Sequence, residues 1–142
     1  MLKEPLTSNL AIEKYTSGGV KLLLRVEGFC VLIAACIAYN NISSDWKQFF
    51  WLFFLPDVSL LGYLVGKKFG AIVYNTLHSY ILPIILFLIA YLANHPQIFP
   101  YIIIWIAHIG FDRALGYGLK YASGFSDTHL GKIKDWKAKN EA

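Results

Sequence analysis

Polar side chains with metal-binding chemistry occur in pairs with helical spacing inside apolar segments. His108 and Asp112 are four positions apart within residues 107–118 (AHIGFDRALGYG), so both project from one helix face. Asn75 and His78 are three positions apart and also share a face. Imidazole nitrogens and carboxylate oxygens are ligands of zinc and similar divalent cations. The spacing therefore predicts a metal site, although HxxxD is a far less specific pattern than HExxH.

Three further charged residues, Glu27, Asp57 and Arg113, also interrupt apolar segments. A charge at the centre of a membrane helix costs about 2.5–3.5 kcal/mol on insertion scales, and such residues mark functional sites by default. Together with Asp112 they carry three negative charges and one positive charge, and a divalent cation would balance the remainder. We predict catalytic roles for Glu27, Asp57 and Arg113, and metal coordination by His78, His108 and Asp112.

This ligand set suits hydrolytic chemistry, because a metal with an open coordination position activates water. We predict a metal-dependent membrane hydrolase acting on a lipid-like substrate, with zinc as the favoured metal. Two other functions stay open. A proton-coupled transporter or permeation protein also uses intramembrane His and Asp residues, and four short spans would then require a homo-oligomer. A non-catalytic protein that binds a lipid or a partner would use the same groups as a structural hydrogen-bond network.

The elements that must position these residues are long apolar segments. The chain has 142 residues, 56% hydrophobic, 16% aromatic and only 15% charged, whereas soluble domains carry about 25% charged residues. Membrane helices need about 20 apolar residues, and runs without alternation favour helices over strands. The sequence predicts an all-α integral membrane four-helix bundle with up-down-up-down topology, whose spans cover residues 21–39, 49–66, 69–93 and 98–119.

The basic residues predict the orientation of this bundle. Of the 13 Lys and Arg residues, only Lys47 falls in a link on the opposite side from the rest. Basic residues are enriched in cytoplasmic loops, so we expect both termini to be cytoplasmic. The predicted organisation is an N-terminal segment (1–20), a transmembrane domain (21–121) and a basic tail (122–142).

The predicted orientation places ionisable groups of all four spans between the midplane and the cytoplasmic side. Glu27 lies about six residues into the first span, roughly 9 Å deep. Asp57 and His108 are near the middles of their spans, and His78 is roughly 14 Å deep. The matching depth predicts one shared site.

The tail contributes candidate accessory residues and a candidate membrane contact. We expect Asp127 or Ser126 to cap a short helix. The alternative is that Asp127 or His129 folds back to close the site from the cytoplasm. Asn75 is a further accessory residue. The lysines of KIKDWKAK favour contact with anionic inner-leaflet lipids. The chain contains no nucleic-acid-binding motif, so we expect no nucleic-acid partner.

Four segments resemble a family known only as a domain of unknown function, number 4260. They are LLRVEG, LPDVSLLGYLVG, YNTLHSYILP and WIAHIGFDRALGYGLKYASGFSDTHLG, and they cover residues 22–133. The resemblance implies a bacterial four-span protein, and hence the bacterial inner membrane as its location. It implies no activity.

Overall fold

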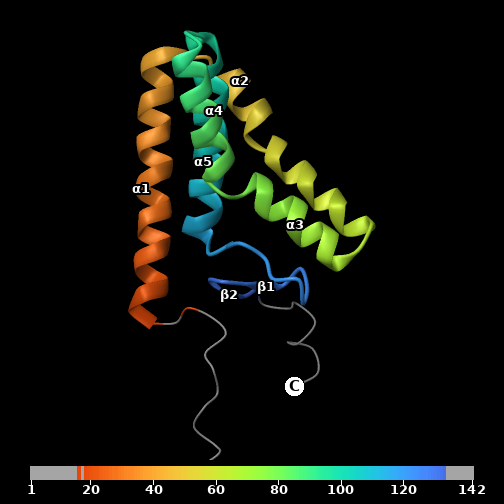
Figure 1. Ribbon diagram of the computed structural model, residues 1–142. Coiled ribbons are helices and arrows are strands. Elements are labelled where there is room, and N and C mark those ends of the chain that lie inside the picture. The colour runs from red at the N-terminus through yellow and green to blue at the C-terminus, as the bar shows by residue number, and fades with distance from the viewer. Residues whose placement is uncertain (1–15, 17, 134–142) are drawn as a thin grey trace, which may run out of the picture.

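The computed structural model describes residue 16 and residues 18–133, which form helices and one small hairpin (Figure 1). The α-helices are α1 (Gly18–Ile42), α2 (Trp46–Phe53), α3 (Lys67–Leu77), α4 (Ile81–Leu92) and α5 (Phe99–Leu115). Two 3-10 helices, η1 (Leu55–Leu64) and η2 (Pro96–Ile98), and the strands β1 (Asp127–Thr128) and β2 (Gly131–Lys132) complete the fold.

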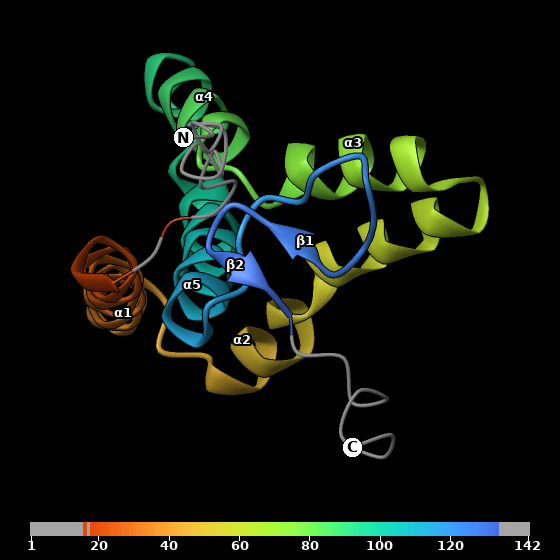
Figure 2. The ribbon, with the colours of Figure 1, turned by 90° about the horizontal axis from the view of Figure 1, so that it is seen from below.

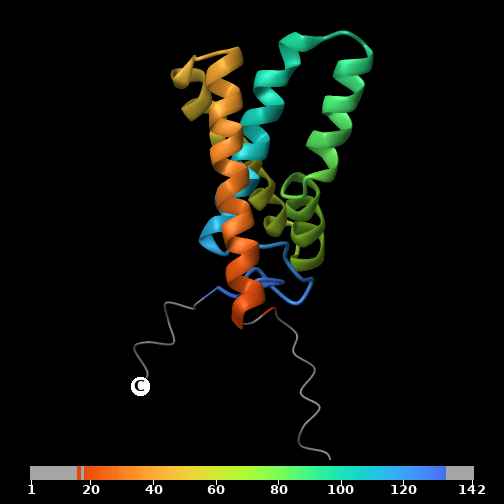
Figure 3. The same ribbon diagram turned by 90° about the vertical axis from the view of Figure 1, so that its left-hand side faces the viewer.

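Helices α1 and α5 form the most closely packed pair, and two glycines allow their backbones to touch. A Cβ atom on Gly28 would lie 2.9 Å from the Gly110 carbonyl oxygen, and one on Gly110 would lie 2.8 Å from the Gly28 oxygen. Buried Ala35 and Ala107 extend this contact along the helices. Figure 3 shows α4 and α5 as an antiparallel pair beside α1, joined at the end opposite the hairpin.

The predicted second span, residues 49–66, is not one helix. The α-helical pattern ends at Phe53, and the chain continues as η1, which has Pro56 in its first turn. Proline has no N–H for an α-helical hydrogen bond and clashes with the preceding turn. The chain then reverses at Gly66 into α3, so the lysines of the predicted link at 67–68 begin a helix instead.

The predicted third span, residues 69–93, is broken. Helix α3 ends at Leu77 and α4 begins at Ile81, with a bend of 40° between them. Pro83 lies in the first turn of α4 and cannot donate to the carbonyl of Ser79. The break therefore follows from the sequence and leaves His78 at the junction.

The last predicted span, residues 98–119, ends four residues early. Helix α5 stops at Leu115 because Gly116 adopts a left-handed conformation with φ of 93°. The following chain turns beneath the helices, and β1 pairs antiparallel with β2 (Figure 2). The hairpin and the first turn of α1 lie at the same end of the molecule.

The described residues include two helices long and apolar enough to cross a membrane. These are Gly18–Ile42 and Pro96–Leu115, and the bent pair Lys67–Leu77 and Ile81–Leu92 would make a third if it is one span. Large apolar side chains are exposed along α1 and α4, among them Phe29 and Leu92. Such surfaces are unfavourable in water and indicate a membrane protein.

Candidate metal centre

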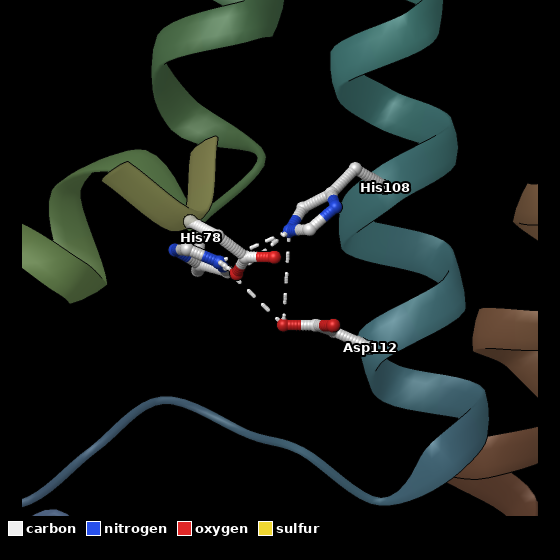
Figure 4. A group of neighbouring side chains, drawn as sticks. His78, His108 and Asp112 are labelled. Carbon is white, nitrogen blue, oxygen red and sulfur yellow. Dashed lines mark hydrogen bonds and ion pairs between the residues drawn. The ribbon is translucent and has the colours of Figure 1, made fainter. Parts of the chain in front are cut away.

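Three elements bring two histidines and two aspartates together at one point (Figure 4). His78 lies at the C-terminal end of α3, His108 and Asp112 project from one face of α5, and Asp57 comes from the first turn of η1. One ligand atom from each residue lies within 4.8 Å of the other three. We refer to Asp57, His78, His108 and Asp112 as the His/Asp cluster.

The separations within the His/Asp cluster match the spacing of ligands around one small cation. The two Nε2 atoms of His78 and His108 are 3.1 Å apart. Asp57 Oδ1 lies 3.4 Å from His78 Nε2 and 3.5 Å from His108 Nε2. Asp112 Oδ2 lies 3.5 Å and 3.9 Å from the same two nitrogens. Tetrahedral ligands at about 2.0–2.1 Å from zinc are about 3.3–3.4 Å apart, so these atoms could hold a metal with little movement.

Contacts around His78 present its Nε2 atom to the cluster. The Nδ1 atom of His78 lies 3.0 Å from the carbonyl oxygen of Tyr74. A carbonyl can only accept, so Nδ1 carries the proton and Nε2 of the neutral ring carries the lone pair. This arrangement is typical of metal-binding histidines, whose second nitrogen donates to a carbonyl or carboxylate.

Tyr74 supports the cluster in two further ways. Its ring stacks on the His78 ring at a centroid distance of 3.7 Å, and its hydroxyl donates to Asp112 Oδ2 over 3.0 Å. One side chain therefore orients a histidine from α3 and an aspartate from α5. Tyr74 was not among the residues predicted for the site, although its spacing of four from His78 places both on one helix face.

The cluster is buried on the side of α5 and open on the side of η1. The side chains of His78 and His108 are 3% and 1% exposed, whereas that of Asp57 is 37% exposed. Phe53 packs edge-on against the His108 ring with centroids 5.3 Å apart. The Nδ1 atom of His108 is buried without a hydrogen-bond partner in the described part of the chain. Asp57 is thus the member of the cluster that is most accessible to solvent.

An apolar groove of about 400 Å³ is lined by several residues that neighbour the cluster residues in the chain. Pro56 and Leu77, which line it, immediately precede Asp57 and His78 in the chain, and Ile104 lies one turn before His108 on α5. Trp105 also lines the groove and donates to the Leu77 carbonyl, which the break after α3 leaves without a helical partner. The volume lies within the range of about 300–1,000 Å³ that is typical of ligand pockets.

The segment after α5 forms a floor beneath Tyr74. Both amide atoms of Asn75 bind the backbone of Lys120, accepting from its N–H over 2.7 Å and donating to its carbonyl over 2.8 Å. The Lys120 ammonium donates to the Phe125 carbonyl and lies 3.6 Å and 4.6 Å from the ring centroids of Phe125 and Tyr74. Burial lowers the pKa of Lys120 to about 8. No sequence pattern singled out this lysine.

The accessory residues Asp127 and His129 hold the floor segment rather than the cluster. Asp127 accepts a hydrogen bond from the Ser123 hydroxyl and lies in β1, so the predicted helix cap does not form. His129 Nδ1 accepts from the Leu119 N–H over 2.9 Å. Burial lowers the pKa of His129, and the nearby Arg113 charge contributes further. The segment passes beneath the helices, but these side-chain hydrogen bonds of Asp127 and His129 are within the segment itself.

The structure does not bring Glu27 and Arg113 to the cluster. Both line a separate crevice of about 460 Å³ between α1 and the start of α4, together with Tyr80. The Arg113 guanidinium lies 5.7 Å from the Tyr80 ring centroid, and the Tyr80 hydroxyl is buried without a partner among the described residues. The six residues predicted for catalysis and metal binding therefore divide into two groups, and Asp57 joins the predicted metal ligands.

The fold and the cluster together define a helical membrane protein with a group of His and Asp side chains that could hold a metal ion. The chain belongs to the family described as Domain of unknown function (DUF4260), whose profile matches residues 21–133. This match confirms the resemblance found from the sequence motifs. Comparisons with curated proteins and with solved structures gave no match.

Proposed function

We propose that the protein is a membrane-embedded metalloenzyme that binds one divalent metal ion, with zinc favoured, in the His/Asp cluster. The observation that carries this proposal is the set of four candidate ligand atoms that all lie within 4.8 Å of one another, with the two imidazole nitrogens 3.1 Å apart and 3.4–3.9 Å from the carboxylate oxygens. Two imidazoles and two carboxylates are a typical donor set for zinc. The largely enclosed Asp112 carboxylate, close to that of Asp57, would also gain from a cation that balances its charge in this apolar setting.

Hydrolysis of a lipid-like substrate is the activity that best uses these features. A bound divalent metal makes water nucleophilic near neutral pH and polarises the bond under attack. Asp57 is the most exposed of the four residues, so displacement of its carboxylate from the metal would open a coordination position. The displaced carboxylate could then take the proton released by water. The apolar groove lined by Pro56 and Leu77 would hold a hydrocarbon chain with its polar linkage directed at the cluster.

The location that we propose is the bacterial inner membrane, with both termini cytoplasmic and four passes of the chain. Helix α1, the α2–η1 segment, the bent α3–α4 pair and α5 would be the passes. The distribution of Lys and Arg supports this orientation. The first turn of α1 and the hairpin lie at the same end of the molecule (Figure 1), and this arrangement supports an even number of passes.

Metal analysis of the purified full chain tests the proposal. After zinc loading and desalting, we expect about one zinc per chain by elemental mass spectrometry, and loss of that zinc in His108→Ala. His95→Ala is the matched control, because His95 is exposed between α4 and η2, remote from the cluster. Less than stoichiometric zinc in the natural chain, or full zinc in His108→Ala, would overturn the metal site.

An activity measurement separates the hydrolase from a non-catalytic metal protein. The zinc-loaded chain in liposomes should release product from a fluorogenic ester lipid, and His108→Ala should not. Normal zinc content without hydrolysis of ester or phosphoester lipids would leave the metal site standing and contradict the enzyme.

A proton path is the second candidate function, and the direct contact between the two imidazoles favours it. His78 Nε2 and His108 Nε2 are at hydrogen-bond distance, and Asp57 flanks both. Such a chain of titratable groups can pass protons. This candidate, working as a homo-oligomer, predicts a pH-dependent flux in metal-free liposomes that Asp57→Asn abolishes, whereas the metalloenzyme predicts no flux.

A further inference from the structure

A group of three cations surrounds a separate pocket of about 310 Å³ at the hairpin end of the molecule. Lys21 and Arg25 come from α1 and lie one turn apart, and Lys132 comes from β2. The backbone where α5 ends at Gly116 closes one side. We call the space between these three cations the basic pocket. Figure 2 shows β2 on the side of the hairpin nearer to α1.

Specific contacts fix the cations around the basic pocket. The Arg25 Nε atom donates to the Ala114 carbonyl over 2.9 Å, which anchors the guanidinium against the end of α5. The Lys21 ammonium reaches the hairpin, since a Cβ atom on Gly131 would lie 2.8 Å from Lys21 Nζ. Gly131 has φ of 120°, so the left-handed turn itself favours glycine at this contact. The pocket is therefore formed by three segments that are distant in the sequence.

The charge around the basic pocket is unbalanced. No acidic side chain of the described residues lines it, and within the same residues none of the three cations forms an ion pair. Three like charges around one cavity repel one another, and an anion between them would remove that repulsion. The guanidinium retains donors suited to the oxygen atoms of a phosphate group.

The position of the pocket indicates an anion that is attached to hydrocarbon chains. Helix α1 has 25 residues and is about 37 Å long, which exceeds the roughly 30 Å hydrocarbon core of a bilayer. Its first turn, with Lys21, can therefore extend into the headgroup region, and the long Arg25 side chain, one turn further in, can direct its charged end toward the same region. Beside them, Leu22 and Leu23 are 62% and 58% exposed on the outer surface of α1, where acyl chains would lie.

We propose that the basic pocket binds the phosphate of an anionic phospholipid headgroup, whose acyl chains lie along α1. Basic pockets between membrane helices at the cytoplasmic side are known to hold such headgroups. This site is distinct from the His/Asp cluster and does not depend on a metal there. Its role is to seat a structural or regulatory lipid where α1, α5 and the hairpin meet.

Lipid binding to the full chain in a neutral detergent tests this proposal by native mass spectrometry. Dioleoyl phosphatidylglycerol should bind at least about 10-fold more tightly than dioleoyl phosphatidylcholine. The double variant Lys21→Gln/Lys132→Gln should weaken phosphatidylglycerol binding on the order of 10-fold. Lys67→Gln/Lys68→Gln is the matched control, because it removes two exposed lysines from the start of α3 and should leave binding unchanged.

Three outcomes would overturn the proposal. Equal binding of the two lipids would remove the anion preference, and unchanged binding in Lys21→Gln/Lys132→Gln would place the lipid elsewhere. The third outcome concerns competition by inorganic phosphate. If millimolar phosphate displaces phosphatidylglycerol completely and stabilises the chain equally against heat, the basic pocket is a site for a soluble anion.

Discussion

Asp112 and Arg113 are neighbours on α5, yet they belong to different sites. Asp112 faces α3 and η1, where four ligand atoms converge and Tyr74 supports two of them. Arg113 faces α1 and Tyr80, where Glu27 lines the same crevice but forms no ion pair within the described residues. Both sites contain ionisable groups in apolar surroundings, but only the first has the geometry of a ligand set.

The contrast shows that matching depth does not by itself create a shared site. Neighbouring residues of an α-helix point about 100° apart, so one helix can serve two sites at the same level. The elements that pack against each face then decide the chemistry. Helix α3 and η1 bring donors to Asp112, whereas α1 presents Gly28 and an exposed Glu27 near Arg113.

The strongest test of this contrast is a pair of substitutions at the two neighbours. Asp112→Asn removes a charged ligand and should weaken zinc binding more than about 100-fold, beyond the effect of losing an outer partner. Arg113→Gln should leave zinc affinity unchanged, because the Arg113 side chain lines the other crevice. Competition with a chromophoric chelator measures both. Equal losses in the two variants would mean that the sites act as one.

A smaller effect is expected when the hydroxyl of Tyr74, one of two tyrosines near His78 in the chain, is removed. Tyr74→Phe removes the hydroxyl that donates to Asp112 but keeps the ring stacked on His78, so zinc affinity should fall about 10-fold. Tyr80→Phe is the matched control, since that hydroxyl has no partner among the described residues. If Tyr80→Phe costs as much as Tyr74→Phe, the assigned support of Asp112 is wrong.

The smallest predicted effect is a pH dependence due to Lys120. Burial lowers its pKa to about 8 in the folded protein, from 10.5 for an ordinary lysine. The unfolded chain therefore binds this proton more tightly, and folded stability should rise as pH increases from about 8 to 10.5. In Lys120→Met this part of the rise disappears. The increase in melting temperature between about pH 8 and 10.5 should therefore be smaller than in the natural chain by a few degrees.

The control for that measurement is Lys67→Met, which removes an exposed lysine at the start of α3. It should reproduce the pH dependence of the natural chain. Identical pH profiles for all three proteins would contradict the assignment of a buried, easily deprotonated lysine beneath Tyr74.

The sequence predicted the helical class and a mixed group of His and Asp side chains, because both follow from apolar run length and local spacing, whereas it predicted one continuous span over residues 69–93 where the structure has a break. His108 and Asp112 share a face in any α-helix, so their pairing required no tertiary information. The sequence could not show that Glu27 faces a different crevice, because periodicity within one helix does not determine its rotation relative to the others. It also could not show that η1 replaces the second half of a span, which depends on packing against α3.

The break between α3 and α4 also has a mechanical consequence. His78 occupies the joint itself, and its ring contacts α5 through His108 and Asp112. The two halves of the bent segment cannot straighten from their 40° angle without withdrawing that ring from α5. An ion bound in the cluster would therefore tie the joint to α5, and its removal would allow the angle between α3 and α4 to change.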